Sequence, residues 1–381
     1  MTAAWDVTVH RDLAEADLDT DRWDALFGAR SFYSATPWLR HAQATAATAP
    51  YYFTAAQDDG EPSAALPAYP LDATTPYVFC SPGRVTAAIH ERLTGKAADW
   101  PAALMPALAC GGRNPSHTKA GVSTDLPPQQ QREALHELVA AAEHTAWQAD
   151  LEAVSFLYVD EDDTLLRQVL TSRQYTALPG QTAYSLKVPA DGRFDTYLAR
   201  FPSRHRVKIR KEVRVLAEAG VTYCTQPLTD ELIEQIAPLE TALYAKHGTP
   251  ADPGAFLAVL RSVATNAEPA ARVTTAHLDG ELAGFVLTFT HGGQLYARQG
   301  GFDYAAKGRL PLYFGLVYYE LLRLAMAEGL THIHYSTGSD EVKMSRGCTP
   351  VRQFAYVKAR REHVASRLAE LGAREPHRES A

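Results

Sequence analysis

The chain has 381 residues, of which 46% are hydrophobic and 21% charged, and its net charge is −7. This length exceeds a typical domain of roughly 100–200 residues, so we expect two domains. The composition is that of a globular protein and not of a disordered chain. The negative charge argues against a protein whose whole surface coats nucleic acid or anionic membrane, although it leaves room for a local basic site.

The cysteine spacing and the N-terminal sequence indicate the cellular compartment in which the protein functions. The four cysteines lie far apart, and no pair has zinc or redox-motif spacing: Cys80, Cys110, Cys224 and Cys348. The N-terminus lacks the basic start and apolar run of a signal peptide, and no apolar stretch approaches the ~18 residues of a membrane span. We therefore expect a cytoplasmic protein with free thiols, no membrane partner, no metal and no bound cofactor.

The first half alternates alanine-rich helical segments with short runs rich in β-branched and aromatic residues, which is typical of α/β folds. The expected strands are Trp5–His10, Tyr51–Ala56, Ala64–Tyr69, Ala153–Val159 and Thr182–Val188. The expected helices are Asp21–Ala29, Pro37–Ala47, Pro128–Gln148 and Asp162–Ser172. Asp58, Asp59 and Gly60 supply turn residues between the second and third strands, which we expect to pair.

The second half repeats this alternation from about Gly192 onward. The expected helices are Arg193–Ala219, Thr229–Lys246, Phe256–Ala264, Pro311–Glu328 and the charged tail after Arg360. The expected strands are Val221–Thr225, Arg272–Leu278, Leu282–Thr290, Gln294–Gln299, His332–Tyr335 and Phe354–Lys358. Both halves end in the order hairpin, strand, helix, strand. We therefore expect two α/β (α+β) lobes, residues 1–190 and 191–381, each with a mixed, mainly antiparallel sheet flanked by helices.

The strongest local signal is a cationic segment in the second half, in which six Lys or Arg side chains fall within the eleven residues 204–214, against one acid. At helical spacing, Ile209, Val213 and Leu216 form an apolar stripe that docks on the lobe. The cations would then form a ridge that binds phosphate groups, because Arg and Lys both pair with phosphate. A solvated charged face is the alternative. The ridge residues singled out for binding are Arg204, Arg206, Lys208, Arg210 and Lys211.

Two further segments combine glycines with polar residues after a strand. In the first, Gly300 and Gly301 precede Asp303 and Tyr304, where backbone amides would meet an acyl carbonyl or a phosphate. A plain strand-to-helix connection is the alternative reading of this segment.

The second segment, residues 335–347, presents Lys343 and Arg346 from a polar glycine loop. A cation there would stabilise the oxyanion that forms when an amine attacks an ester or thioester. A surface loop with a Lys–Glu pair is the alternative reading.

Together these segments resemble the Fem-type aminoacyltransferases, relatives of the GNAT-fold acyltransferases. The resemblance covers about residues 190–360. It rests on an ordered pattern: S-x-x-R-x-x-x-R-K from Ser203, the Asp279-Gly280 hairpin, a helix ending A-x-x-x-G at Gly329, and G-S-D-x-x-K-x-x-x-G from Gly338 to Gly347.

The resemblance implies amide formation by direct attack of an amine on an activated acyl carbonyl. By position, Lys343 matches the lysine that contacts the reacting carbonyl. Arg204 and Arg206 match the basic residues that hold phosphates of aminoacyl-tRNA or of another donor. Asp303 and Asp340 are candidate bases or anchors for the acceptor ammonium, and Tyr304 and Arg346 are candidate substrate-binding residues.

The chain departs from the CoA-using relatives, whose Q/R-x-x-G-x-G/A motif has no match in residues 306–310. The long charged coiled-coil hairpin of some cell-wall Fem enzymes is also not apparent. We therefore expect aminoacyl-tRNA as donor and a small amine, such as an antibiotic intermediate, as acceptor. The alternatives are an acyl-CoA-dependent N-acyltransferase and a non-catalytic RNA-binding protein on the same fold.

Overall fold

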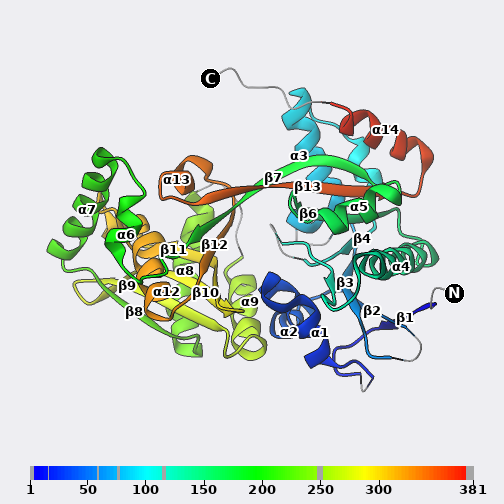
Figure 1. Cartoon of the computed structure of the whole chain (residues 1–381). Coiled ribbons are helices and arrows are strands. Elements are labelled where there is room, and N and C mark those ends of the chain that lie inside the picture. The colour runs from blue at the N-terminus through cyan, green and yellow to red at the C-terminus, as the bar shows by residue number, and fades with distance from the viewer. Residues whose placement is uncertain are drawn as a thin grey trace. The chain divides into compact units, whose positions relative to one another are not determined.

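The computed structural model describes residues 4–15, 17–57, 60–74, 78–113, 117–246 and 252–374. The chain forms two compact units (Figure 1): unit 1 comprises residues 1–183 and 351–381, and unit 2 comprises residues 184–350. This division differs from the expected lobes 1–190 and 191–381. The reason is that strand β13 (Thr349–Ala359) pairs antiparallel with β6 (Ala153–Asp160), so the last segment belongs with unit 1.

In unit 1 the strands follow the order β1-β2-β3-β4-β6-β13, with β5 beside β3. The remaining strands are β1 (Trp5–His10), β2 (Tyr51–Gln57), β3 (Ala64–Leu71), β4 (Ala107–Cys110), β5 (Gly121–Val122) and the first part of β7 (Thr176–Lys187). The helices are α1 (Thr20–Phe27), α2 (Thr36–Ala44), α3 (Pro82–Thr94), α4 (Pro128–Gln148), α5 (Thr164–Ser172) and α14 (Glu362–Gly372).

In unit 2 the strand order is β12-β11-β10-β9-β8, beside the last residues of β7. The strands are β8 (Thr222–Pro227), β9 (Ala271–Leu278), β10 (Glu281–His291), β11 (Gln294–Phe302) and β12 (His332–Thr337). The helices are α6 (Phe194–Ala199), α7 (Ser203–Glu218), α8 (Asp230–Lys246), α9 (Pro253–Asn266), α10 (Tyr304–Lys307), α11 (Leu312–Phe314), α12 (Leu321–Ala327) and α13 (Asp340–Met344).

The two units share one order of elements. Apart from α3 and β5 in unit 1 and the short α10 and α11 in unit 2, a first strand is followed in each by two helices, three antiparallel strands, a helix and a strand that runs parallel to the third of those strands. The parallel pairs are β4 with β6 and β11 with β12. Both units are thus α/β lobes with a mixed, mainly antiparallel sheet flanked by helices, as expected.

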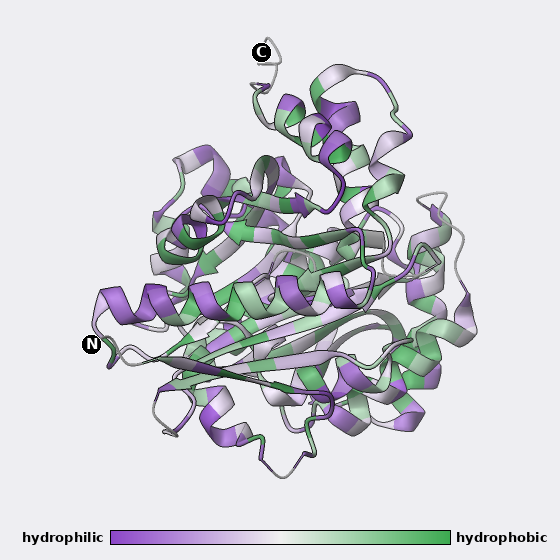
Figure 2. Ribbon diagram, turned by 90° about the vertical axis from the view of Figure 1, so that its right-hand side faces the viewer, coloured by the Kyte–Doolittle hydropathy of each residue, from purple (hydrophilic) through white to green (hydrophobic). Residues whose placement is uncertain are grey.

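Helix periodicity decides which faces are buried. In α4 the buried residues recur at helical spacing and pack with the strands of unit 1 (Ala134, Leu135, Leu138, Val139, Ala142 and Ala146). In α7, Ile209 and Leu216 are buried and Val213 packs against the core of unit 2, as the apolar stripe predicts. Figure 2 shows hydrophilic and hydrophobic residues alternating along many of the helices, the pattern of elements with one buried face.

The elements differ from expectation in several places. The expected helix Arg193–Ala219 is two helices, α6 and α7, because Pro202 disfavours the helical conformation of the preceding residue. The expected helix Pro311–Glu328 contains a π-helical stretch over Gly315–Glu320. Helix α3 was not expected at all. The turn residues Asp58 and Asp59 lie outside the described residues, although β2 and β3 pair antiparallel as predicted.

The four cysteines are free, three of them buried and Cys224 exposed, which confirms the prediction of unpaired thiols. Within the described ranges, no helix combines the length and the apolar character required to span a bilayer.

Candidate active site

The candidate site lies in unit 2, where two parallel strands separate. The ladder between β11 and β12 joins only Gln294–Tyr296 to His332–His334, although β11 continues to Phe302 and β12 to Thr337. The ends of both strands beyond this shared ladder face a cavity of about 580 Å³. Such a volume suits a small-molecule site.

A β-bulge shapes the β11 side of the opening. In the β10–β11 ladder Leu287 pairs with Gln299 and Thr288 with Ala297, so Arg298 is the extra residue. Bulges bend a strand and redirect its side chains. The bulge thereby brings Ala297, Arg298, Gln299 and Gly300 to the cavity wall.

The remaining wall comes from the helices around the strand ends and from further positions on β10, β11, β12 and the turn before α13. It includes aromatic and aliphatic side chains (Leu243, Val286, Phe302, Tyr304, Tyr313, Val317, Tyr318, Tyr335 and Val342) together with Lys246, Lys307, Ser339 and Lys343. The mixture of apolar walls and a few polar groups is that of a binding pocket.

Lys343 is the buried cation of this cavity, with only 5% of its surface exposed. Its Nζ donates to the backbone carbonyls of Ser336 at 3.0 Å and Thr337 at 2.7 Å. Since an ammonium has three N–H donors, one remains for a ligand. Burial lowers the pKa of Lys343 to about 8, an effect that the charges of Cys348 and Asp340 partly offset.

The backbone next to Lys343 is strained. Ser336 (φ 58°) and Ser339 (φ 55°) both adopt the left-handed conformation, which residues other than glycine rarely adopt. The turn leads β12 into α13, so that the Lys343 ammonium lies beside the last carbonyls of the strand. Strain of this kind is concentrated at functional sites, which agrees with the position of the turn at the cavity.

The cavity wall is positively charged. The charged residues that line it are Lys246, Arg298, Lys307 and Lys343, and the described lining contains no Asp or Glu. The Nζ of Lys246 lies 4.1 Å from the centre of the Tyr304 ring, a cation–π contact that orders both side chains. The arrangement favours a ligand with anionic groups.

An acidic residue lies directly behind this wall. Glu240 of α8 is 1% exposed, and its Oε1 accepts a hydrogen bond of 2.8 Å from the Gln299 amide. Its Oε2 is buried and has no hydrogen-bond partner among the described residues. Burial raises the pKa of Glu240, against the lowering effects of Gln299 and Arg298. Sequence reasoning missed this pair, because its members are separated by 59 residues.

Gly301 allows α8 to approach β11. A Cβ atom at Gly301 would lie 2.5–2.7 Å from the backbone atoms of Leu239 and Glu240. The glycine is therefore required for packing, in addition to the amide-donor role that the sequence indicates for this segment. Gly300, its neighbour, lines the cavity.

The two predicted carboxylates lie near the cavity without lining it. Asp303 is the N-cap of α10 and accepts from the amides of Ala305 at 2.8 Å and Ala306 at 2.9 Å. Asp340 is exposed in the first turn of α13. Tyr304, predicted to bind substrate, does line the cavity. A catalytic role for either carboxylate stays a prediction.

The cationic helix α7 is beside the site but outside the cavity. None of its described side chains is among the lining residues. Arg206 donates to the Phe201 carbonyl at 2.8 Å, and Arg210 lies 3.3 Å from Asp195. Arg204, Lys208 and Lys211 are exposed, and within the described ranges no partner is found for them. The lining of this cavity thus includes Lys343 and none of the α7 cations.

Arg346 connects α7 to the loop that carries Lys343. It is 1% exposed, and its guanidinium lies 3.1 Å from both carboxylate oxygens of Glu212. Tyr319 donates to the same carboxylate, and the Arg346 guanidinium lies 3.8 Å from the centre of the Phe314 ring. These contacts make Arg346 a positioning residue for the loop, whereas the sequence indicated direct substrate binding.

The π-helical stretch borders the cavity through Val317 and Tyr318. The Tyr335 hydroxyl donates to the Val317 carbonyl at 2.9 Å. Stretches of π-helix are often found at functional sites, because the extra residue changes which side chains face a cavity. This feature could not be read from the apolar pattern of residues 311–328.

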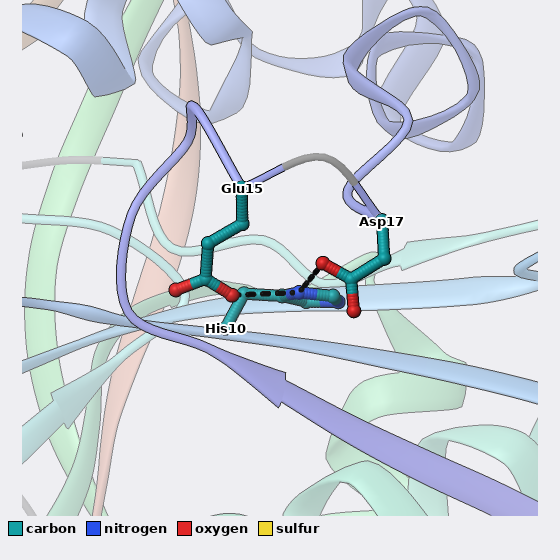
Figure 3. Close-up of side chains that lie close together, drawn as sticks. All are labelled: His10, Glu15 and Asp17. Carbon is teal, nitrogen blue, oxygen red and sulfur yellow. Dashed lines mark hydrogen bonds and ion pairs between the residues drawn. The ribbon is translucent and has the colours of Figure 1, made fainter.

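Unit 1 contains a group of side chains at metal-ligand spacing, shown in Figure 3. Glu15 and Asp17 both approach the Nδ1 of His10, at 3.2 Å and 3.5 Å. Glu15 also accepts hydrogen bonds from the amides of Arg11 and Asp12. These contacts explain the cluster structurally, because they link β1 to the loop that follows it.

Comparison with known proteins shows the class of this chain. The profile of the FemAB-like family, described as peptidoglycan biosynthesis and recognition, matches residues 115–379, more than half of the chain. The chain therefore belongs to the FemAB-like family and is an acyltransferase. No curated protein matches the sequence.

Solved structures agree on the fold. The crystal structure of FemX is similar with a TM-score of 0.60 and 14% identity, over 89% of this chain and 96% of that one. A tandem GNAT protein from the clavulanic acid biosynthesis pathway gives a TM-score of 0.54 and 14% identity, over 93% and 98%. A conserved protein of unknown function from Bacteroides thetaiotaomicron gives 0.53 and 11%, over 90% and 98%. The tandem GNAT-like architecture is thus established.

Proposed function

We propose that this acyltransferase moves an aminoacyl group from aminoacyl-tRNA to the amine of a small molecule. The amine attacks the ester carbonyl, so a C–N bond forms and the C–O bond to the ribose breaks. The amine loses a proton and the ribose oxygen gains one. Because the ester is already activated, the protein mainly has to position both substrates and stabilise the developing oxyanion.

The observation that carries the proposal is the buried Lys343 ammonium. Two of its donors are taken by the carbonyls of Ser336 and Thr337, which leaves the third for a carbonyl oxygen in the cavity. A pre-positioned donor in a water-poor site stabilises an oxyanion more strongly than solvent does. Lys246, Arg298 and Lys307 suit a phosphate of the donor or a carboxylate of the acceptor.

The exposed cations of α7 support tRNA as the donor. Arg204, Lys208 and Lys211 are free to pair with a phosphate backbone, and α7 packs against the segment that contains Val317 and Tyr318 of the cavity wall. The segment after β11 supports the same choice over acyl-CoA. Between Asp303 and Pro311 the chain forms the short helix α10, and it lacks the glycine pattern that clasps a pyrophosphate.

The test is a transfer assay in which radiolabelled aminoacyl-tRNAs and acyl-CoAs are compared as donors, with glycine and phosphoethanolamine as amine probes that carry an anionic group. The proposal predicts labelled amide product from aminoacyl-tRNA and little product with the Lys343→Ala variant. Product formed from acyl-CoA alone would show that acyl-CoA, and not aminoacyl-tRNA, is the donor. tRNA binding without any turnover would favour a non-catalytic RNA-binding protein.

A further inference from the structure

Unit 1 contains an insertion that unit 2 lacks. In unit 2, β10 and β11 are joined by Gly292 and Gly293 alone. The equivalent strands of unit 1, β3 and β4, are separated by residues 72–106, which include α3. Ser81 accepts a hydrogen bond from the amide of Arg84 at the start of this helix, and Gly95 ends it in the left-handed conformation. The insertion is therefore an ordered helix with both ends capped.

A second cavity, of about 530 Å³, lies beside α3 and within unit 1. Its lining residues come from α3, from the segment before it, from β6 and from β7 (Phe79, Arg84, Val85, Ala87, Ala88, Ile89, Arg92, Leu157, Tyr158, Gly180 and Gln181). On α3 these residues follow the spacing i, i+1, i+3, i+4, i+5, i+8, so one face of the helix forms the wall. The volume falls in the range of roughly 300–1,000 Å³ of small-molecule sites.

The floor of this cavity is apolar and held in place. Ile89, Leu157 and Tyr158 are all less than 5% exposed and belong to one hydrophobic cluster. The Tyr158 hydroxyl donates to the Phe79 carbonyl at 2.6 Å. That bond fixes the backbone of Phe79, whose side chain remains 57% exposed. The Phe79 ring adds exposed apolar surface at the edge of the cavity.

The charged residues that line this cavity are basic. Arg84 and Arg92 lie two turns apart on the face of α3, on either side of the small residue Ala88. The described lining has no Asp or Glu. Arg92 donates to the Pro179 carbonyl, whereas Arg84 is exposed and has no partner among the residues that the structure describes. A guanidinium beside an apolar wall recognises a carboxylate attached to an apolar body.

We propose that the α3 cavity of unit 1 is a second binding site, for a small organic molecule with an apolar body and a carboxylate held by Arg84 and Arg92. This inference does not depend on the acyl donor or acceptor of unit 2. It concerns an insertion that the duplicated fold does not require.

The experiment is equilibrium dialysis of the full chain with radiolabelled octanoate, with octanol and octylamine as neutral and cationic probes of the same length. We expect saturable binding of octanoate and weaker binding of both other probes. Arg84→Ala should weaken octanoate binding about tenfold, because it removes one charge-assisted pair. Ala88→Phe should abolish binding by filling the space between the arginines.

Two matched variants locate the probe. Arg132→Ala removes an exposed arginine from α4 of the same unit and should leave octanoate binding unchanged. Lys307→Ala changes the cavity of unit 2 and should also leave octanoate binding unchanged. Equal affinity for octanol, no binding at millimolar octanoate, or a loss caused by Lys307→Ala and not by Arg84→Ala would each overturn the proposal. Circular dichroism checks that every variant is folded.

Discussion

Raising the pH through 8 is the perturbation that most sharply probes the role of Lys343. Burial lowers its pKa from 10.5 to about 8, a shift that corresponds to about 3 kcal/mol between the charged and neutral forms. If the ammonium stabilises the oxyanion, the rate of acyl transfer falls about tenfold per pH unit above that pKa. If the neutral amine acts as a base, the rate rises through the same range.

The titration of Lys343 does not itself destabilise the fold in this pH range. The folded pKa of Lys343 lies below the unfolded value of about 10.4, so the unfolded chain binds more protons between these values. This lysine therefore favours the folded state increasingly as the pH rises from about 8 to 10.4.

The assay is a single-turnover measurement of amide formation between pH 6.5 and 9.5 with saturating donor. Lys343→Arg is the matched variant, because a guanidinium stays charged across this range. The acceptor amine titrates equally with both proteins, so the ratio of wild-type to variant rate isolates Lys343. A ratio that is flat across pH 8, or that rises, would refute the assignment of the ammonium as oxyanion donor.

Three other outcomes follow from the contacts. Replacing Arg204 and Lys208 by Ala should weaken tRNA binding and reduce its salt dependence by about two units of slope, as filter binding at several salt concentrations would measure. Glu212→Ala should lower the free energy of unfolding by about 3–5 kcal/mol in urea denaturation, because it leaves the buried charge of Arg346 unpaired. An effect below ~1 kcal/mol would show that water reaches that guanidinium. Gly301→Ala should reduce both stability and transfer rate, because its Cβ would displace α8 from β11, and unchanged kinetics would contradict this packing role.

Local patterns in the sequence predicted much of the fold, since they depend on neighbours along the chain. The 3.6-residue spacing of Ile209, Val213 and Leu216 identified the buried face of α7, and the structure has it. The predicted helix Pro128–Gln148 has the bounds of α4. Helix α3 was missed, although Ser81 before Pro82 and the later Gly95 are start and stop signals that could have located it.

What the sequence could not predict depends on contacts between distant residues. Arg346 follows a glycine loop and reads as a substrate ligand, yet its partner Glu212 is 134 residues away. The hydrogen bond between Glu240 and Gln299 likewise cannot be predicted until the packing of α8 on β11 is known. The assignment of residues 351–381 to unit 1 follows from the pairing of β13 with β6, which no local pattern encodes.

Lys343 was singled out from the polar glycine loop and from the resemblance, and the structure adds the contacts that suit it to the proposed role. Its burial, its two carbonyl partners and its place on the cavity wall are all consequences of the turn between β12 and α13. The ridge on α7 was also recognised from sequence, but its separation from the cavity was not. The proposed function therefore assigns the two features separable roles, one at the reacting carbonyl and one on the donor's phosphates.

The most direct test of this account compares the single-turnover transfer rate of wild-type protein and Lys343→Ala, with tRNA affinity measured on the same preparations. The account predicts a fall in rate of about 10²–10³-fold, the usual effect of removing one oxyanion donor, with tRNA affinity unchanged. A variant that transfers at the wild-type rate, or that loses tRNA affinity and rate in equal measure, would contradict it.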